Sequence, residues 1–292
     1  MTRFAFFIMR LLHGLPLPLL AVLGNGLGML LYRFGRERRH VADVNLRLCF
    51  PDMTEAARDK LVRRNFRAFG RSFIERGILW WSDAARIQKL VQVTGLEHYQ
   101  NAIAQGPVIL LVPHFVALDA GWSWLTQHGN LVSMYSNQKN RVFHDQLLRG
   151  RLRFGDSQLY SRQQGLRPII KAMREHLPFY YLPDQDLNAK DSLFIPFFGV
   201  PAATLSTVPR LAKTADAKVV PCITRMLPHA AGYEIRFYPA WDNYPTGDLA
   251  ADTRRVNEFI EQRVREIPEQ YFWLHKRFKT RPPGEKRGRF YQ

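Results

Sequence analysis

The sequence predicts an α/β domain, in which helices flank a central mixed sheet, preceded by an N-terminal membrane-anchoring helix. Two observations predict this fold class. After residue 90, short apolar runs alternate with segments of helical periodicity, which is typical of a sheet with helices on its faces. Before that point, residues 4–31 are almost wholly apolar, and roughly 20 such residues suffice to cross a bilayer. The 292 residues can bury a sizeable core, so we expect an anchor at residues 1–32 and one folded domain at residues 33–292.

The N-terminal stretch contains Arg10, Pro16 and Pro18, which suit a kinked or interfacial segment as well as a straight span. A secretory signal peptide is disfavoured, because the apolar part is too long and lacks a small-residue cleavage site. A buried core helix stays open as the alternative. A basic run follows at once: Arg33, Arg36, Arg38 and Arg39. Because positive flanks stay cytoplasmic, we expect the rest of the chain on the cytoplasmic side.

Residues 54–81 are predicted to form an amphipathic helix, with Thr54 as its N-cap and Glu55 in its first turn. An apolar stripe has helical spacing: Leu61, Val62, Phe66, Phe69 and Phe73. The opposite face is basic: Arg58, Lys60, Arg63, Arg64, Arg67 and Arg71. This basic face, which ends in Ile-Leu-Trp-Trp at residues 78–81, is either solvated or lies against lipid headgroups, where Trp is favoured.

The segment after residue 90 supplies the predicted sheet and its helices. Strands are expected at 108–112, 131–135, 179–182, 219–223 and 233–238. Helices are expected at 97–104, 119–128, 140–154, 165–176, 203–214 and 251–266. The chain has no internal repeat and no low-complexity linker, so we expect these elements to form one domain.

The formal net charge of +17 predicts attraction to polyanions, namely nucleic acid, an anionic membrane surface, or acidic proteins and phosphorylated ligands. Charge alone does not choose among these. Cys49 and Cys222 are the only cysteines and have no metal-ligand spacing around them. We therefore expect small core residues rather than a disulfide or zinc site, in a reducing compartment.

His114 and Asp119 form the sharpest local feature. His114 follows the strand predicted at 108–112, where α/β sheets place ligands, and Asp119 comes five residues later at the start of a predicted helix. A carboxylate bonded to one imidazole nitrogen leaves the other as a general base, which suits deprotonation of a hydroxyl that attacks an acyl carbonyl. The spacing alone is weak evidence, because a loop pair or a helix cap gives the same pattern. No Gly-x-Ser-x-Gly elbow supplies a serine nucleophile, so direct transfer is more natural than an acyl-enzyme.

Asp184 and Asp186 flank Gln185 just after another predicted strand. They suit orientation of Arg or Lys or binding of sugar hydroxyls; a metal is disfavoured, because no His or Glu completes a ligand set, and no cofactor is expected. The apolar residues 194–201 pack in the core or wall an acyl-chain channel. Arginine binds phosphate bidentately, so basic residues near these motifs would suit a phosphorylated substrate. Such residues cluster between His114 and Asp184: Lys139, Arg141, Arg149, Arg151, Arg153, Arg162 and Arg167.

The C-terminal tail from residue 275 to 289 is dense in positive charge, and Pro282, Pro283 and Gly284 prevent a helix there. The aromatic residues 271–274 just before it are expected to pin its start to the core. The tail is therefore either a floppy basic extension or a carrier of positioned charge.

Several motifs along nearly the whole chain point to one family. They are the N-terminal anchor with its basic flank, residues 44–46 and 49–51, the box from His114 to Asp119, residues 183–186 leading to 196–199, Thr204, and PEQYFWLHKRFKTRP at 268–282. At these residues the sequence resembles the lipid A biosynthesis acyltransferases, the late lauroyl/myristoyl transferases of Gram-negative bacteria. Many members of that family have Glu where this chain has Asp119, and Asp is usual in the wider glycerolipid acyltransferase group.

The resemblance implies an inner-membrane enzyme with its catalytic domain on the cytoplasmic face. The acyl donor would be acyl-acyl carrier protein, and the acceptor a 3-hydroxyl of a hydroxyacyl chain on a phosphorylated Kdo-lipid A precursor. His114 would take the acceptor proton and Asp119 would orient His114. Phosphate or carrier contacts would fall to Arg151, Arg153, Arg162 and Arg167, with Asp184 and Asp186 binding substrate or holding those arginines.

Two alternatives stay open at this point. One is a related acyltransferase that acts on a lysophospholipid, an ornithine lipid or a mannoside. The other is a basic, membrane-tethered binding protein for nucleic acid, which the charge alone suggests. No nucleic-acid motif is present and the aromatic residues lie in apolar runs, so nucleic acid is not an expected partner.

Overall fold

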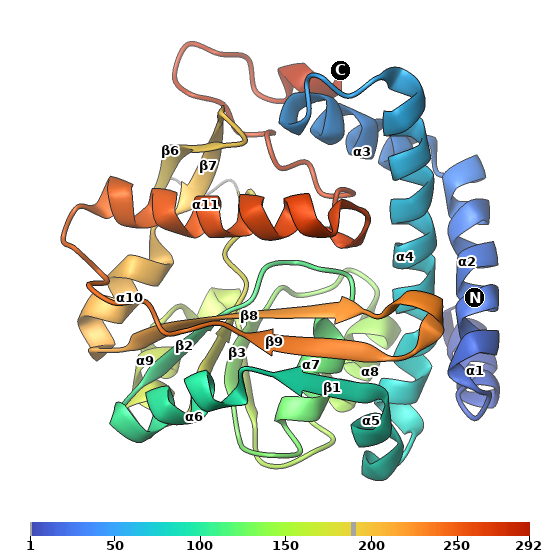
Figure 1. The fold of residues 1–292 in the computed structure, drawn as a ribbon, viewed down its shortest axis with the longest axis horizontal. Helices are drawn as coiled ribbons and strands as arrows, with labels where there is room; N and C mark the ends of the chain where they lie inside the picture. Colours follow the sequence, from blue (N-terminus) through green and yellow to red (C-terminus); the bar gives the residue numbers. More distant parts are fainter. Residues whose placement is uncertain (1, 188–190) are drawn as a thin grey trace.

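The computed structural model describes residues 2–187 and 191–292, and it confirms the α/β architecture with a mixed sheet (Figure 1). A seven-stranded sheet has the order β1-β9-β8-β2-β5-β3-β4. Its strands are β1 (Val91–Thr94), β2 (Val108–Leu111), β3 (Val132–Tyr135), β4 (Gln158–Ser161), β5 (Phe179–Tyr181), β8 (Lys218–Met226) and β9 (Tyr233–Phe237). All neighbours pair in parallel except β8 and β9, which are antiparallel.

Alternate side chains of β2 enter two separate cores, because successive residues of a strand point to opposite faces of a sheet. Ile109 and Leu111 pack in the core that contains α9 (Arg167–Arg174), α10 (Thr207–Ala215) and α11 (Leu249–Glu266). Val108 and Leu110 pack in the core that contains α5 (Ala84–Leu90), α6 (Leu96–Gln105) and α7 (Leu118–Leu125). Helices therefore cover both faces, as the alternating pattern predicts.

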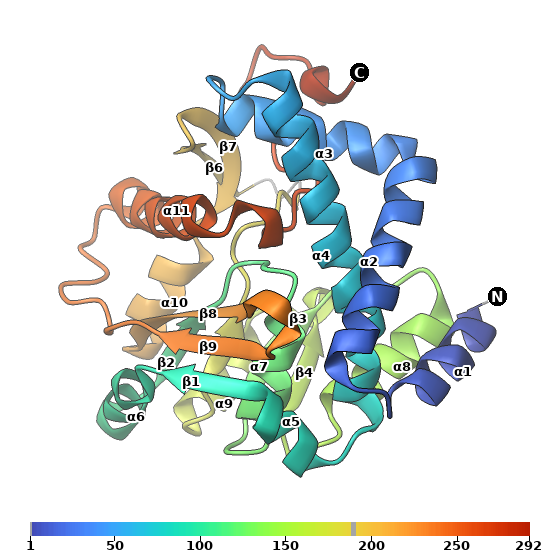
Figure 2. The same cartoon turned by 45° about the vertical axis from the view of Figure 1, so that its right-hand side comes forward.

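The N-terminal apolar stretch forms two helices, α1 (Thr2–Leu12) and α2 (Leu17–Phe34), with Pro16 directly before the second. By length and composition alone, α2 is able to cross a membrane. The next helix, α3 (Arg36–Cys49), leads to α4 (Glu55–Trp81), the long helix expected at 54–81. The Thr54 hydroxyl caps α4 by accepting a hydrogen bond from the Ala57 N–H at 3.3 Å, as predicted. Figures 1 and 2 both show α2 lying along α4.

The C-terminal end of α4, residues 78–81, differs from one of the two expectations for it. Ile78, Leu79 and Trp80 are buried, so these three residues do not lie against lipid headgroups. The Trp80 ring packs edge-on against Phe6, with ring centroids 5.7 Å apart. Trp80 therefore joins α4 to α1 instead of facing lipid. The two cysteines, Cys49 and Cys222, are buried and free, as expected of small core residues.

The five predicted strands are all present, but the described residues contain four others that were not predicted. β1 and β4 are short and carry no apolar run. The hairpin of β6 (Ser192–Phe197) and β7 (Val200–Leu205) replaces the start of the helix expected at 203–214, which begins only at Thr207. Its turn residues Phe198 and Gly199 both have positive φ, 51° and 77°, as a tight two-residue hairpin requires. Phe-Gly is not a usual signal for that turn, so local pattern does not reveal it.

Candidate active site

His114 lies just beyond the C-terminal end of β2, and Asp184 lies just beyond the C-terminal end of β5. These strands are parallel neighbours, so their carboxyl ends meet at one edge of the sheet. The His114 ring nitrogen Nδ1 is 2.7 Å from Asp184 Oδ1. The His114 backbone N–H also donates to Asp184 Oδ2 at 2.9 Å. One carboxylate therefore fixes both the ring and the backbone of this histidine.

Asp184 is buried, with 2% of its surface exposed, yet it is well suited to stay charged. Burial by itself raises the pKa of its carboxyl, but the charge and hydrogen bonds of His114 and the nearby Tyr271 hydroxyl outweigh it, so the pKa is lowered. A charged Asp184 accepts the proton of Nδ1 and leaves Nε2 of His114 as the basic nitrogen. The site thus contains a histidine oriented for general base catalysis.

Asp119 is not the partner of His114, which corrects the arrangement expected from the sequence. Asp119 lies in the first turn of α7, after the N-cap residue Ala117, so it is not a helix cap either. Its Oδ2 accepts from Arg76 Nε at 3.0 Å, and its Oδ1 accepts from Arg151 Nη2 at 2.7 Å. Burial opposes the charge, but Arg151 and Arg76 prevail and hold the pKa of Asp119 at about 2. Both of its oxygens are therefore occupied by arginines.

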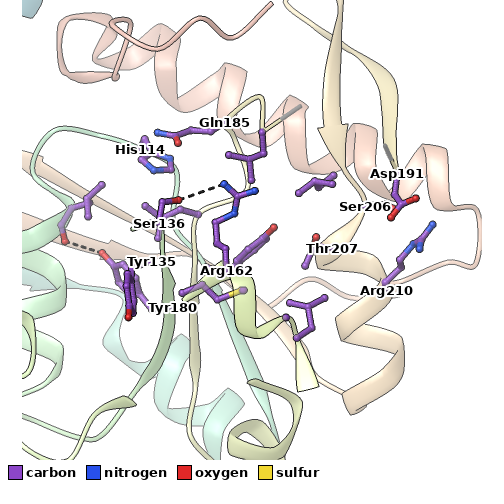
Figure 3. A pocket seen from close by; sticks show the side chains of 18 of the residues that line it. His114, Tyr135, Ser136, Arg162, Tyr180, Gln185, Asp191, Ser206, Thr207 and Arg210 are labelled. Carbon is purple, nitrogen blue, oxygen red and sulfur yellow. Dashed lines mark hydrogen bonds between the residues drawn. The ribbon is translucent and has the colours of Figure 1, made fainter. Parts of the chain in front are cut away.

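A cavity of about 480 Å³ opens beside His114 (Figure 3). Its lining includes aliphatic side chains from distant parts of the chain: Leu118, Met134, Leu147, Leu166, Leu182, Leu187 and Leu205. Charged side chains also line it, namely Arg151, Arg162, Asp191 and Arg210. Figure 3 shows Arg210 and Asp191 on the opposite side of the cavity from His114. The cavity therefore offers an apolar interior with a base at one side and cationic groups along it.

The predicted substrate arginines occupy different places. Arg151 lines the cavity while it binds Asp119, and Arg162 lines it with a hydrogen bond to the Ser136 hydroxyl at 3.4 Å. Arg153 points elsewhere, because it donates to the backbone carbonyls of Leu79 and Ser82 and does not line the cavity. Arg167 is exposed at the start of α9, also outside the lining. Residues 194–201 do not line it either; Ile195, Phe197 and Phe198 of that segment are buried, which favours core packing.

A C-terminal segment, residues 268–281, packs against the loop that carries His114. The local sequence pattern did not predict a role for this segment in the site. The Phe272 N–H donates to the His114 carbonyl at 3.0 Å, and Phe115 and Tyr271 form an antiparallel bridge. Two fully buried asparagines fix this segment. Asn65 of α4 donates to the Tyr271 carbonyl at 2.6 Å, and Asn45 of α3 donates to the Trp273 carbonyl at 2.7 Å. The tail is thus positioned structure at its start, not a floppy extension.

His275 of the same segment holds the loop that carries Asp184. Its Nε2 accepts the Asp186 backbone N–H at 3.0 Å, so this nitrogen is unprotonated. Burial, together with the positive charges of His114 and Arg277, lowers the pKa of His275 to about 4. The Asp186 carboxylate accepts from the Thr280 N–H at 2.6 Å. Asp186 therefore joins two loops, and among the described residues neither it nor Asp184 pairs with Arg151, Arg153, Arg162 or Arg167.

The comparison with known proteins agrees with the motifs. The family described as bacterial lipid A biosynthesis acyltransferase matches residues 1–280. The lipid A biosynthesis lauroyltransferase of Escherichia coli (strain K12) is 35% identical over 279 residues, which cover 95% of this chain and 90% of that protein. The myristoyltransferase of the same strain is 36% identical over 270 residues, 92% and 82% of the two chains. A lipid A biosynthesis acyltransferase of Haemophilus influenzae is 34% identical over 280 residues, 94% and 89%. With matches of this extent, the chain belongs to the bacterial lipid A biosynthesis acyltransferase family.

Proposed function

We propose that this protein transfers a fatty acyl chain from acyl-acyl carrier protein to a hydroxyl of a hydroxyacyl chain on a Kdo-lipid A precursor. The observation that carries the proposal is the pair of His114 with the buried Asp184 beside a largely apolar cavity. The family supports lipid A as the acceptor class, because the relatives are named as lipid A lauroyl-, myristoyl- and palmitoleoyltransferases.

In the proposed step, Asp184 holds the Nδ1–H of His114, and Nε2 removes the proton of the acceptor hydroxyl. The hydroxyl oxygen attacks the thioester carbonyl of the donor. The carbon–sulfur bond then breaks, the sulfur takes the proton from the imidazolium, and an ester and a free thiol result. A positioned general base contributes about 10²–10⁴ in rate. No group outside the donor, the acceptor and these two side chains is required for the balance.

The donor assignment rests on shape and charge together. The aliphatic lining of the cavity suits a fatty chain, which gains about 0.8 kcal/mol per buried CH₂ group. Arg162 and Arg210 are exposed and line the same cavity, and a guanidinium is suited to a phosphate group such as the one on a carrier protein arm. The net charge of +17 favours encounter with an acidic carrier protein and with a phosphorylated acceptor.

The proposed location is the inner membrane, with the catalytic domain on its cytoplasmic face. The apolar helix α2 and the basic residues that follow it support this placement. The helices α1 and α2 pack directly on α4. We therefore propose the division into an anchor, residues 1–32, and a catalytic domain, residues 33–292, as a division of function and not of structure.

The experiment compares lipid A by mass spectrometry in cells with and without the gene, and with the gene carrying His114→Ala. We expect lipid A that lacks one acyl chain in the deletion and in the His114→Ala strain. The matched control is His40→Ala, which removes an exposed histidine on α3 that does not line the cavity, and it should restore normal lipid A. Unchanged lipid A in the deletion would reject this acceptor in favour of a lysophospholipid, an ornithine lipid or a mannoside.

The chemical role of His114 is tested separately with purified protein, acyl-acyl carrier protein and precursor. His114→Ala should remain folded and lose about 10²–10⁴ in turnover. Turnover equal to that of the unchanged chain would reject His114 as the base, whatever the acceptor proves to be.

A further inference from the structure

The outer surface of α1 and α2 is unusually apolar. Ten of the twelve large hydrophobic side chains that are exposed in the described part of the chain lie on these two helices, and the other two are Ile103 and Leu152. The ten define the apolar face: Phe4, Phe7, Ile8, Leu11, Leu19, Val22, Leu23, Leu30, Leu31 and Phe34. Exposed apolar side chains concentrated on two consecutive helices need a cover, whereas singly scattered ones do not.

The inner side of α2 is locked against α4 in backbone contact. Its buried residues recur at helical spacing: Leu17, Leu20, Ala21, Gly24, Gly28 and Tyr32. A Cβ added to Gly24 would lie 2.5 Å from the Arg71 Cα, and one added to Gly28 would lie 2.2 Å from the Phe66 carbonyl oxygen. A Cβ added to Gly70 of α4 would lie 2.4 Å from the Gly28 nitrogen. Small residues on both helices permit this approach, and no lipid fits between them.

Both ends of this helical pair are also fixed to the domain. The Thr2 hydroxyl accepts from Asn140 Nδ2 at 2.7 Å, which joins the start of α1 to the cap of α8 (Arg141–Arg151). Arg86 of α5 donates to the His13 carbonyl, in the link between α1 and α2, at 2.6 Å. At the far end the Tyr32 hydroxyl donates to Asp59 of α4. The two helices and the domain thus form one body, as Figure 2 shows from the side of α2.

Because α2 and α4 are in backbone contact, they must lie at the same depth in a membrane. If α2 crossed the bilayer, the middle of α4 would have to enter the hydrocarbon beside it. That part of α4 carries four exposed cationic side chains, of which Arg63 pairs with Asp59 and Arg64 with Glu269: Lys60, Arg63, Arg64 and Arg67. The Arg67 backbone lies against α2, because a Cβ added to Gly28 would be 2.7 Å from the Arg67 Cα. Charged side chains at bilayer depth are strongly unfavourable, and Arg86 of α5 would have to cross with the link that it binds, so spanning conflicts with the fold.

The positive charges beside the apolar face indicate that an anionic lipid surface covers it. Arg3 and Arg10 are exposed on α1, and Arg33 and Arg36 are exposed at the end of α2 and the start of α3. Helices with an apolar face and flanking arginines bind in the plane of an anionic lipid surface, with the apolar side in the acyl region. A second copy of the chain would place these arginines against each other, which disfavours it.

We propose that α1 and α2 lie in the plane of the cytoplasmic leaflet, with the apolar face buried in lipid, and that residues 2–34 do not cross the bilayer. The proposal deepens the membrane location proposed above and rests on it. It has a consequence for the site: α4 also carries Arg76, which binds Asp119, and Asn65, which holds Tyr271. The leaflet surface therefore stands at a fixed distance from the cavity that receives the lipid acceptor.

The test measures on which side of the membrane the link between α1 and α2 lies. Gly14→Cys places a thiol in that link, where an added Cβ meets nothing within 4 Å. Gly129→Cys is the matched control on the catalytic domain, also exposed and free of contacts. The natural cysteines are buried and give a low background. A membrane-impermeant thiol reagent is applied to the full-length protein in spheroplasts and in inverted inner-membrane vesicles.

We expect both thiols to react in inverted vesicles and neither to react in spheroplasts. Reaction of Gly14→Cys in spheroplasts, with Gly129→Cys reacting only in inverted vesicles, would show that α2 spans and would overturn the proposal. Activity is measured on the same protein in detergent. Loss of acyl transfer to lipid A with both thiols on the same side would reject the proposed function and leave the topology standing.

A second measurement identifies the cover of the apolar face. The purified protein is sedimented with vesicles of phosphatidylglycerol and phosphatidylethanolamine. Joint substitution of Phe4, Phe7 and Leu11 by Ser should weaken binding at least about tenfold, because three apolar side chains leave the lipid. Ile103→Ser, at an exposed apolar residue of α6, should bind like the unchanged protein. Equal binding of both variants, or a dimer that the triple substitution dissociates without any vesicle binding, would overturn the proposal.

Discussion

Asp184 and Asp119 are two buried carboxylates near one cavity, and they differ in the kind of partner that neutralises them. Asp184 binds His114, whose charge changes with the proton it carries, and the second ring nitrogen is left for chemistry. Asp119 binds Arg76 and Arg151, which keep their charge at all relevant pH values. The first pair is suited to move a proton. The second holds three elements together, because Arg76 belongs to α4, Asp119 to α7 and Arg151 to α8.

The largest effect is expected for Asp184→Asn. The amide is able to donate to Nδ1, which favours the tautomer with the proton on Nε2, so His114 no longer presents a free base. Turnover should fall about 10²–10⁴-fold with little change in KM, and the protein should remain folded by circular dichroism. Turnover within twofold of the unchanged protein would contradict the assignment of Asp184 as the partner of His114.

Asp119→Asn should act on stability more than on chemistry. It leaves Arg76 and Arg151 without a counter-charge in a partly buried site, and breaking such a pair costs about 3–5 kcal/mol. We expect a large drop in the urea midpoint of unfolding, and a smaller loss of turnover per folded molecule than for Asp184→Asn. The reverse pattern, normal stability with abolished turnover, would move Asp119 from a holding role into the chemistry.

Mild acid should separate the two regions. The pKa of His275 in the folded protein, about 4, lies below the value near 6.5 of an unfolded histidine, so protonation favours the unfolded state. Its contribution is complete above pH 6.5 and is lost as the pH falls toward 4, by about 3 kcal/mol at most. The pKa of Asp119 is about 2, so its stabilisation is present above about pH 4 and is lost only between about 4 and 2.

The measurement is the free energy of unfolding from pH 7 to pH 3, compared among the unchanged chain, His275→Gln and Asp119→Asn. Glutamine retains a hydrogen-bond acceptor for the Asp186 N–H but does not titrate. His275→Gln should flatten the profile between pH 6.5 and 4, whereas Asp119→Asn should alter it only below about pH 4. A profile of His275→Gln parallel to that of the unchanged chain would show that His275 is not the group responsible.

The sequence predicts elements with a local signal and cannot predict which residues the fold brings together. The five strands and the cap at Thr54 follow from nearby residues, and His114 is placed by the strand that ends before it. Its partner depends on β2 and β5 being neighbours, a contact between residues about 70 positions apart along the chain. A five-residue spacing therefore favoured Asp119, although the fold supplies Asp184.

The supports of the site are hidden for the same reason. Asn65 lies on the helix predicted at 54–81, and Asn45 lies in a motif of the family, but nothing near either residue indicates a carbonyl in the C-terminal segment as its partner. Gly24 and Gly28 are spaced as small residues of a close helix pair are, yet the pattern does not distinguish lipid-embedded from domain packing. In each case the deciding information lies in a distant segment of the chain.

Asp119→Glu is expected to have the smallest effect, and it separates the role of the charge of Asp119 from the role of its geometry. The negative charge is kept, so Arg76 and Arg151 retain a counter-ion, but the longer side chain enters a closely packed site. Asp119 is buried, with 7% of its surface exposed, and both of its oxygens already contact arginines. Overpacking of this kind costs about 1–3 kcal/mol, less than the loss of the charge. Urea unfolding should therefore rank Asp119→Glu between the unchanged chain and Asp119→Asn, with turnover close to that of the unchanged chain. A Glu variant as unstable as the Asn variant would show that geometry, and not charge, is what Asp119 provides to the two arginines.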